Sequence, residues 1–167
     1  HITKPAINLI KENFNLEIET SPQIQIESIL IKKAISEFNI DKNKKNILLG
    51  IGGSGPTKRI PSKTFLSVIK KICEIKDSIF FLATGKNKDE QIILNEILNS
   101  NYKNRCIPLD HLSIKETLPL IKNCDISICN DSSFAHLSSA LGVKTITLMA
   151  DTPLIYGSYS SNMYPII

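Results

Sequence analysis

The 167-residue sequence lacks the features that mark membrane-spanning, zinc-binding and P-loop proteins. It has no run of about 18 apolar residues, so no segment is expected to span a membrane as a helix. Its four cysteines, Cys73, Cys106, Cys124 and Cys129, form no C-x-x-C pair, which argues against a zinc site. The pattern G-x-x-x-x-G-K-[ST] is also absent. We expect reduced, buried thiols and therefore a reducing compartment.

Neither sign of charge dominates the chain. Lysine and arginine number 20 against 16 acidic residues, which gives a formal net charge of +4. The lysines are scattered and alternate with apolar residues, as is typical of solvated helix faces rather than of a nucleic-acid surface. Nucleic acid is therefore not an expected partner. A basic face still suits an anionic membrane surface or a phosphorylated ligand.

From residue 46 onward, short apolar runs alternate with amphipathic stretches. This repetition predicts a Rossmann-like α/β domain over 46–167, with a parallel sheet and helices on both faces. Residues 1–45 hold two further amphipathic stretches and form a lead-in. The expected strands are 46–51, 78–85, 105–109, 125–130 and 144–150, and the expected helices are 4–14, 27–38, 62–75, 88–100, 113–124 and 131–142.

Several residues are predicted to begin or end these helices. Ser62 is a candidate N-cap, and Ser113 with Glu116 has the spacing of a capping box. Gly142 is expected to close the last helix. Because the chain begins with His1 and ends in an apolar stretch, we interpret it as a piece of a longer protein.

A glycine-rich loop follows the first expected strand. Gly50, Gly52 and Gly55 have the spacing G-x-G-x-x-G of a dinucleotide-binding turn. Pro56 and Pro61, however, keep the next helix from beginning inside the loop. The second strand also ends without the acidic residue that binds the ribose in NAD proteins. NAD is therefore disfavoured.

The same loop suits another anion. Its backbone N–H groups can approach a ligand closely, and Lys58 and Arg59 add positive charge beside them. A diphosphate is the expected ligand, and a plain surface turn is the alternative.

A second group of polar residues follows the fourth expected strand. Asp131, Ser132 and Ser133 come where a strand meets a helix N-terminus, whose unpaired N–H groups attract phosphate oxygens. Asp131 also fits the simpler role of an N-cap. His136 lies about a turn and a half further along and can approach the same cleft.

The segments "KRIP", "DSSFAHLSSALG" and "TLMADTP" together resemble the donor-binding half of the family 9 glycosyltransferases, the lipopolysaccharide heptosyltransferase-like enzymes. The resemblance covers about residues 46–157, and the lead-in resembles that family's interdomain segment. It implies the C-terminal half of a GT-B enzyme, in which two Rossmann-like domains enclose a cleft. The N-terminal acceptor domain, with the catalytic base, is then absent, and this fragment carries no catalytic residue and is expected to be inactive alone.

The resemblance also implies which residues bind the donor. Lys58 matches the lysine that contacts the donor's phosphates, Asp131 would bind sugar hydroxyls, and Leu112 would lie against the base. The full set of implied donor-binding residues is Gly53, Ser54, Lys58, Thr84, Gly85, Leu112, Asp131, Ser132, Ser133 and His136.

The implied ligand is a nucleotide-diphospho-sugar, which is ADP-heptose in the best-known members. No cofactor is expected, and because no Asp-x-Asp motif is present, no metal is expected either. The implied acceptor is lipid-linked or is lipopolysaccharide, reached through the missing domain. Such an enzyme would be cytoplasmic, at the inner face of the inner membrane, with a peripheral membrane contact left open.

Two alternatives remain at this point. One is another GT-B sugar-nucleotide enzyme. The other is a non-catalytic Rossmann-like interaction module, which is suggested by Ser133 standing where the family has glycine.

Overall fold

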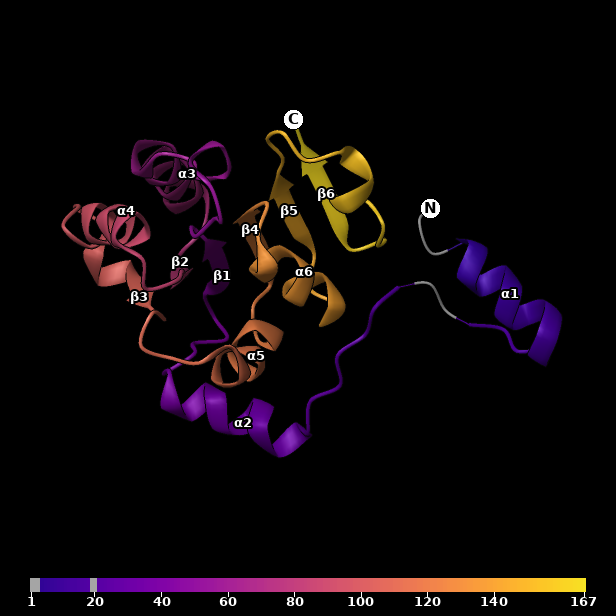
Figure 1. The fold of residues 1–167 in the computed structure, drawn as a ribbon. Helices are drawn as coiled ribbons and strands as arrows, with labels where there is room; N and C mark the ends of the chain where they lie inside the picture. The colour runs from indigo at the N-terminus through magenta and orange to yellow at the C-terminus, as the bar shows by residue number, and fades with distance from the viewer. Residues whose placement is uncertain (1–3, 19–20) are drawn as a thin grey trace.

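A computed structural model describes residues 4–18 and 21–167, and this part of the chain contains a six-stranded parallel sheet (Figure 1). The strand order is β3-β2-β1-β4-β5-β6. The strands are β1 (Lys45–Gly50), β2 (Ser78–Ala83), β3 (Cys106–Pro108), β4 (Ile126–Asn130), β5 (Thr145–Leu148) and β6 (Met163–Ile166). The helices are α1 (Lys4–Phe14), α2 (Ser28–Glu37), α3 (Ser62–Ile75), α4 (Lys88–Leu98), α5 (Ile114–Lys122) and α6 (Ser133–Ala140). The predicted fold class is confirmed.

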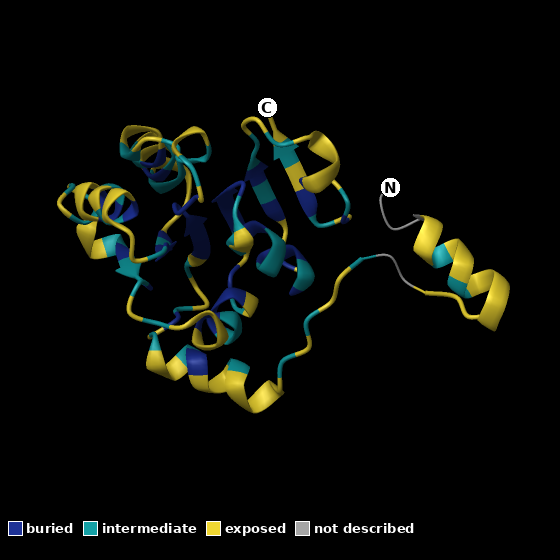
Figure 2. Ribbon diagram, in the orientation of Figure 1, coloured by how far each residue is buried: buried dark blue, intermediate teal, exposed yellow. Residues whose placement is uncertain are grey.

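The central strands are apolar along their whole length because helices cover both faces of the sheet (Figure 2). Alternate residues of β2 enter separate cores. Phe80 packs on the side of α3 and α4, whereas Phe81 packs on the side of α5 and α6. Both rings are fully buried. The resulting two-sided core fixes the carboxyl ends of the strands, where ligands bind in such sheets.

Local signals at the helix ends gave mixed results. The capping box of Ser113 and Glu116 is present in both directions, and Gly142 adopts a φ of +77° just after α6. The prediction that Ser62 caps α3 is wrong, because Pro61 occupies the N-cap position and Ser62 is the first helical residue. Its hydroxyl donates instead to Glu96 of α4.

Strand β6 was not predicted. It pairs with β5 in parallel and forms one edge of the sheet. Its four residues include Pro165 and two exposed side chains, Tyr164 and Ile166. Proline is confined to edge strands because it lacks the N–H that a central ladder needs. Pro165 therefore made the strand hard to predict from the sequence, and it also explains why β6 lies at the edge of the sheet.

The lead-in divides into two parts. Helix α2 packs on α5, and the side chain of Asn123 donates to the carbonyl of Ile31 at 3.0 Å. Helix α1 stands away from the sheet in Figure 1, and its apolar residues Leu9 and Phe14 are exposed. The domain division at residue 45 stays a prediction.

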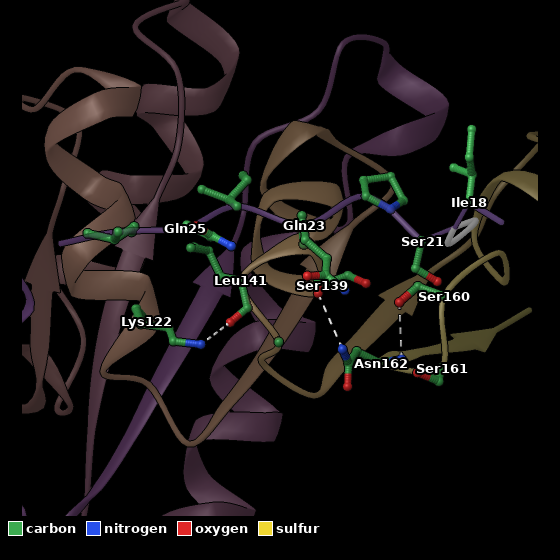
Figure 3. Close-up of a pocket in the computed structure, with 15 residues that line it drawn as sticks. Ile18, Ser21, Gln23, Gln25, Lys122, Ser139, Leu141, Ser160, Ser161 and Asn162 are labelled. Carbon is green, nitrogen blue, oxygen red and sulfur yellow. Dashed lines mark hydrogen bonds between the residues drawn. The ribbon is translucent and has the colours of Figure 1, made fainter. Parts of the chain in front are cut away.

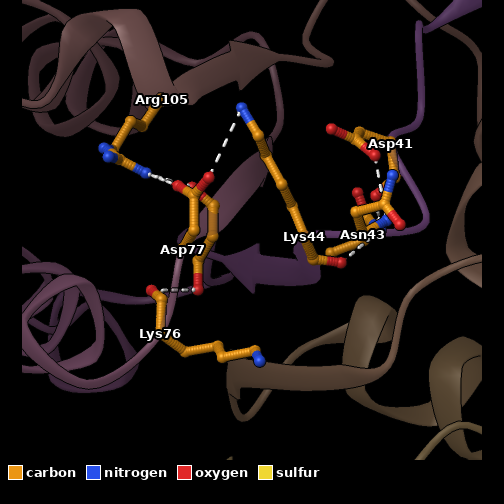
Figure 4. Close-up of polar contacts among 8 residues, drawn as sticks. Asp41, Asn43, Lys44, Lys76, Asp77 and Arg105 are labelled. Atoms are coloured by element: carbon orange, nitrogen blue, oxygen red, sulfur yellow. Dashed lines mark hydrogen bonds and ion pairs between the residues drawn. The ribbon is translucent and has the colours of Figure 1, made fainter.

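A polar cluster lies at the amino ends of β1 and β2, opposite the expected ligand edge (Figure 4). Asp77 pairs with Arg105 and, at 3.6 Å, with Lys44. The Arg105 guanidinium also donates to the carbonyl of Ser78 at 3.2 Å. These contacts tie the connection after α3 to the start of β3.

Replacing Asp77 with asparagine is expected to lower stability at neutral pH and to leave it nearly unchanged in acid. The hydrogen bond from Arg105, aided by the charges of Lys44 and Arg105, lowers the pKa of Asp77 below its ordinary value near 3.8. A depressed pKa gives stability that is present above the ordinary value and is lost as pH falls through the folded-state pKa. Urea unfolding of wild type and Asp77→Asn should therefore differ at about pH 7 and converge at about pH 2. Glu12→Gln, on exposed α1, is the control, and a gap that persists in acid would contradict this account.

Candidate functional site

A cavity of about 760 Å³ opens at the carboxyl ends of β1 to β4. Its position spans the junction of β1 and β4, where the strand order reverses direction, and this is where open α/β sheets bind ligands. Its volume lies within the range of small-molecule sites. It is lined by Gly52, Gly53, Ser54, Thr84, Gly85, Lys86, Glu90, Asp110, His111, Leu112, Ser113, Ile114, Glu116, Ser132, Ser133 and Phe134.

Most of the predicted donor-binding residues line this cavity, and the rest lie beside it. Those in the lining are Gly53, Ser54, Thr84, Gly85, Leu112, Ser132 and Ser133. Lys58 and Asp131 lie outside the lining and pair with each other, and His136, also outside it, contacts Tyr159 in the loop after β5. The structure thus brings the predicted residues to one edge of the sheet, while their role in binding stays a prediction.

The backbone of the glycine loop passes close to Lys58 at Gly53. A Cβ atom added there would lie 2.7 Å from the carbonyl oxygen of Lys58, so only glycine fits without a shift of the backbone. Beyond it, Pro56–Lys58 forms a short 3₁₀ turn, and α3 begins only at Ser62. The third glycine of the motif, Gly55, therefore lies well outside the helix. The loop is not an NAD-type turn, as its prolines predicted.

Lys58 reaches from the glycine loop to the end of β4. Its Nζ lies 2.9 Å from Oδ2 of Asp131. The Asp131 side chain is 5% exposed and that of Lys58 is 26% exposed. The ion pair joins the two sequence motifs, which are far apart along the chain, at a single point beside the cavity. It also places a cationic Nζ next to the N-terminus of α6.

The ionised state of Asp131 is favoured by its neighbours. Burial raises the pKa of this carboxyl, a hydrogen bond from Thr152 and the contact with Lys58 lower it, and the net effect is a decrease. Its pKa therefore lies below the ordinary value near 3.8. A carboxylate that stays charged at neutral pH holds the Lys58 ammonium in place.

The N-terminus of α6 faces the cavity. The helix begins at Ser133, and Ser132 is its N-cap, so Asp131 precedes the helix and is not its cap. Ser132 makes no side-chain capping bond, and its Oγ is buried without a hydrogen-bond partner among the described residues. The first N–H groups of the helix are likewise not satisfied by a side-chain cap. This end of α6 can therefore accept an anion.

Glu90 is a site residue that the sequence did not reveal. It lies in the first turn of α4, yet it is only 6% exposed. Its Oε1 accepts a hydrogen bond of 2.7 Å from the N–H of Gly53, and a Cβ on Gly52 would lie 2.8 Å from the same oxygen. An acidic group thus does stand beside the end of β2, but it comes from the helix rather than from the strand. In the sequence, Glu90 is recognisable only as an acidic residue three positions after the N-cap Asn87. Its burial is visible only in the structure.

The segment between β5 and β6 contacts three residues of the site. Asp151 accepts a hydrogen bond of 3.2 Å from the hydroxyl of Thr57 in the glycine loop. Thr152 hydrogen-bonds to Asp131. Tyr159 lies 2.8 Å from Nδ1 of His136, with the two rings stacked. One segment therefore contacts the loop, the strand end and α6.

A second cavity, of about 980 Å³, lies at the opposite edge of the sheet (Figure 3). It is lined by the lead-in around Gln23, the carboxyl end of α6 and the residues just before β6. Two of its polar side chains bond to nearby backbone: Lys122 donates to the carbonyl of Leu141 at 2.5 Å, and Asn162 donates to that of Ser139 at 3.4 Å. This cavity is a junction between the lead-in and the sheet, away from the strand ends that bind ligands.

Metal and thiol chemistry have few candidate groups. Across residues 4–18 and 21–167, no three His, Cys, Asp or Glu side chains gather in a way that could hold a metal ion. Burial raises the pKa of the Cys106 and Cys129 thiols to about 12, which keeps them protonated and unreactive. Among the described helices, none is both long and apolar enough to cross a membrane.

Comparison with known proteins gives a consistent family assignment. The family model described as Glycosyltransferase family 9 (heptosyltransferase) matches residues 1–164. Lipopolysaccharide heptosyltransferase 1 of Campylobacter coli is 34% identical over 148 residues, which are 82% of this chain and 41% of that protein. The chain thus spans less than half the length of this relative.

Two solved structures share the fold. The E. coli ADP-heptose lps heptosyltransferase II superposes with a TM-score of 0.74 at 21% identity, over 87% of this chain and 45% of that one. A family 9 glycosyl transferase from Veillonella parvula superposes with a TM-score of 0.80 at 17% identity, over 99% of this chain and 48% of that one.

Proposed function

Because this chain belongs to glycosyltransferase family 9, as its motifs indicated, we propose that it is the donor-binding part of a heptosyltransferase-like enzyme of lipopolysaccharide synthesis. The donor is a nucleotide-diphospho-sugar, and ADP-heptose is the first candidate because a structural relative is described as acting on it. The observation that carries the proposal is the 2.9 Å pairing of Lys58 with Asp131, which sets the lysine beside the N-terminus of α6 and the main cavity.

The diphosphate is held, in this proposal, between two positive features. Lys58 supplies a point charge from the glycine loop. The N–H groups at Ser132 and Ser133 supply hydrogen bonds and the positive end of the helix dipole. Asp131 already accepts a contact from Lys58 and is placed to bind hydroxyl groups of the sugar. The nucleoside extends toward Leu112 along the rest of the cavity.

The proposed reaction is an inverting transfer. An acceptor hydroxyl attacks the anomeric carbon, the bond from that carbon to the diphosphate oxygen breaks, and the acceptor's proton passes to a base. The nucleoside diphosphate leaves with additional negative charge, which Lys58 and the α6 N-terminus stabilise. No metal is needed for that role in this scheme. The base belongs to the part of the protein that faces this domain in a GT-B enzyme, and not to this chain.

The acceptor follows from the relatives rather than from this chain. A lipid-linked or lipopolysaccharide acceptor is proposed because the C. coli relative is a lipopolysaccharide heptosyltransferase. Such an acceptor is made at a membrane, so we propose that the complete enzyme works at the inner face of the inner membrane.

Titration of the chain with ADP, UDP and GDP by calorimetry tests the donor assignment. We expect ADP to bind, with the same affinity in the presence of a chelator, and no sugar transfer by this chain alone. Tighter binding of UDP or GDP would favour another GT-B enzyme. Failure to bind any of the three would favour a non-catalytic module, and turnover by the isolated chain would contradict the proposed division of roles.

Glu90 is expected to bind the ribose. Its buried carboxylate borders the cavity near Gly85, and acidic groups at this place in related sheets accept hydrogen bonds from ribose hydroxyls. Glu90→Gln keeps an acceptor for the Gly53 N–H but loses the charge, and it should weaken ADP binding about 10-fold. The loss should be smaller for 2′-deoxy-ADP, and Glu74→Ala, on the exposed face of α3, should change the affinity for neither nucleotide. Equal losses for both nucleotides would place Glu90 away from the ribose.

A further inference from the structure

His136 and Tyr159 form a pair at the back of the site. The phenol oxygen of Tyr159 lies 2.8 Å from Nδ1 of His136. The two rings are nearly parallel, with an angle of 13° between their planes and 5.6 Å between their centres. His136 is on α6, whereas Tyr159 is on the segment between β5 and β6, so the contact is made by the fold and not by the local sequence.

The geometry leaves the two ring nitrogens of His136 in different situations. Nδ1 makes a hydrogen bond with the phenol of Tyr159. In a neutral imidazole only one nitrogen carries a proton, and the hydrogen bond made by one nitrogen determines whether the proton is on the other. A phenol is a good donor, and burial raises the pKa of Tyr159, so its hydroxyl keeps its proton well above neutral pH. A phenol that keeps its proton can donate it to Nδ1, and the 2.8 Å separation fits such a hydrogen bond.

We propose that Tyr159 is a positioning residue for His136: its hydroxyl donates to Nδ1 and holds the neutral imidazole as the tautomer with its proton on Nε2. His136 then presents a donor, rather than an acceptor, from its other nitrogen. Such a donor matches the anionic oxygens of a diphosphate or a hydroxyl oxygen of the sugar. The choice of this ligand rests on the proposed function, whereas the tautomer does not.

Tyr159 belongs to a segment that also contacts other residues of the site. The same segment bonds to Thr57 through Asp151 and to Asp131 through Thr152. Three members of the site are thus contacted by one segment, and Tyr159 is its contact with His136.

Long-range proton–nitrogen correlation spectra of the ligand-free chain identify the tautomer. The chain has three histidines, and the signals of His136 are assigned by their loss in His136→Asn. At about pH 9, where imidazoles are generally neutral, we expect the Nε2–H form in wild type and a mixture of forms in Tyr159→Phe. Tyr156→Phe removes a hydroxyl from the same segment and should leave the spectrum unchanged. An Nδ1–H form in wild type, or an unchanged tautomer in Tyr159→Phe, overturns the proposal.

A titration with ADP supplies the second readout. Tyr159→Phe should weaken ADP binding about 2- to 10-fold, and Tyr156→Phe should not. A changed tautomer with unchanged ADP affinity would overturn the positioning role. A wild-type chain that shows the expected tautomer but binds no ADP would support the Tyr159 contact and contradict the proposed function alone.

Discussion

Replacing Lys58 with alanine is expected to weaken ADP binding by this chain about 10- to 100-fold, because a charge-assisted contact to phosphate is lost. The lysine extends from the glycine loop and ends 2.9 Å from Asp131, beside the α6 N-terminus. Calorimetry on wild type and variant measures the difference. Lys71→Ala removes an equal charge from the exposed face of α3 and should leave the affinity within about 2-fold.

Lys58→Ala is also expected to lower stability, and this effect must be distinguished from the loss of ADP binding. Without Lys58, Asp131 becomes a buried charge without its partner, which is destabilising in itself. The double variant Lys58→Ala with Asp131→Asn removes both charges and should recover most of the stability. Its ADP affinity should stay low. Recovery of binding in the double variant would show that Lys58 acts only by neutralising Asp131.

Gly53→Ala is expected to abolish measurable ADP binding while the sheet stays folded. The new methyl group would meet the carbonyl oxygen of Lys58 at 2.7 Å, so the loop must open and carry the lysine and the Gly53 N–H away from the cavity. A displacement of this kind removes several contacts at once, and a loss of more than about 100-fold is expected.

Gly55→Ala is the matched control for this loop. The nearest atom to a Cβ at Gly55 is the Thr57 hydroxyl oxygen at 4.0 Å, an ordinary contact. The variant should bind ADP within about 2-fold of wild type, and both variants should keep the far-ultraviolet circular dichroism of the parent. Equal affinities of Gly53→Ala and Gly55→Ala would show that the loop does not hold the nucleotide.

The sheet could be predicted from the sequence because its strands are buried on both faces. A run such as Ile47–Ile51 has no polar face, and such runs separated by amphipathic helices leave few alternatives to a parallel sheet. The prolines of the glycine loop were equally informative, because Pro56 and Pro61 act on the backbone directly. Both signals are local, and both were confirmed.

The site could be predicted only in outline. Lys58 and Asp131 each belonged to a recognisable motif, but their pairing depends on the order of β1 and β4 in the sheet. Glu90 appeared as an ordinary acidic residue in a helix's first turn, and its role depends on a contact with Gly53 across 37 positions. Tyr159 lies in a segment without regular spacing, so nothing in the sequence connected it to His136.

The exact beginnings of helices were the least predictable local feature. At α6, Asp131 and Ser132 are both good N-caps by residue type, but Ser132 takes the N-cap position without a capping bond, and Asp131 pairs with Lys58. The helix therefore begins at Ser133, two residues after Asp131. This start matters for function, because it leaves the first N–H groups of α6 without a side-chain cap.

A crystal structure of this chain with ADP tests the central claim most directly. We predict that the pyrophosphate lies within about 3 Å of both Lys58 Nζ and a backbone N–H of Ser132 or Ser133, with the base near Leu112. Phosphates bound away from Lys58, or ADP held in the cavity beside the lead-in, would contradict the assignment of this edge of the sheet as the donor site.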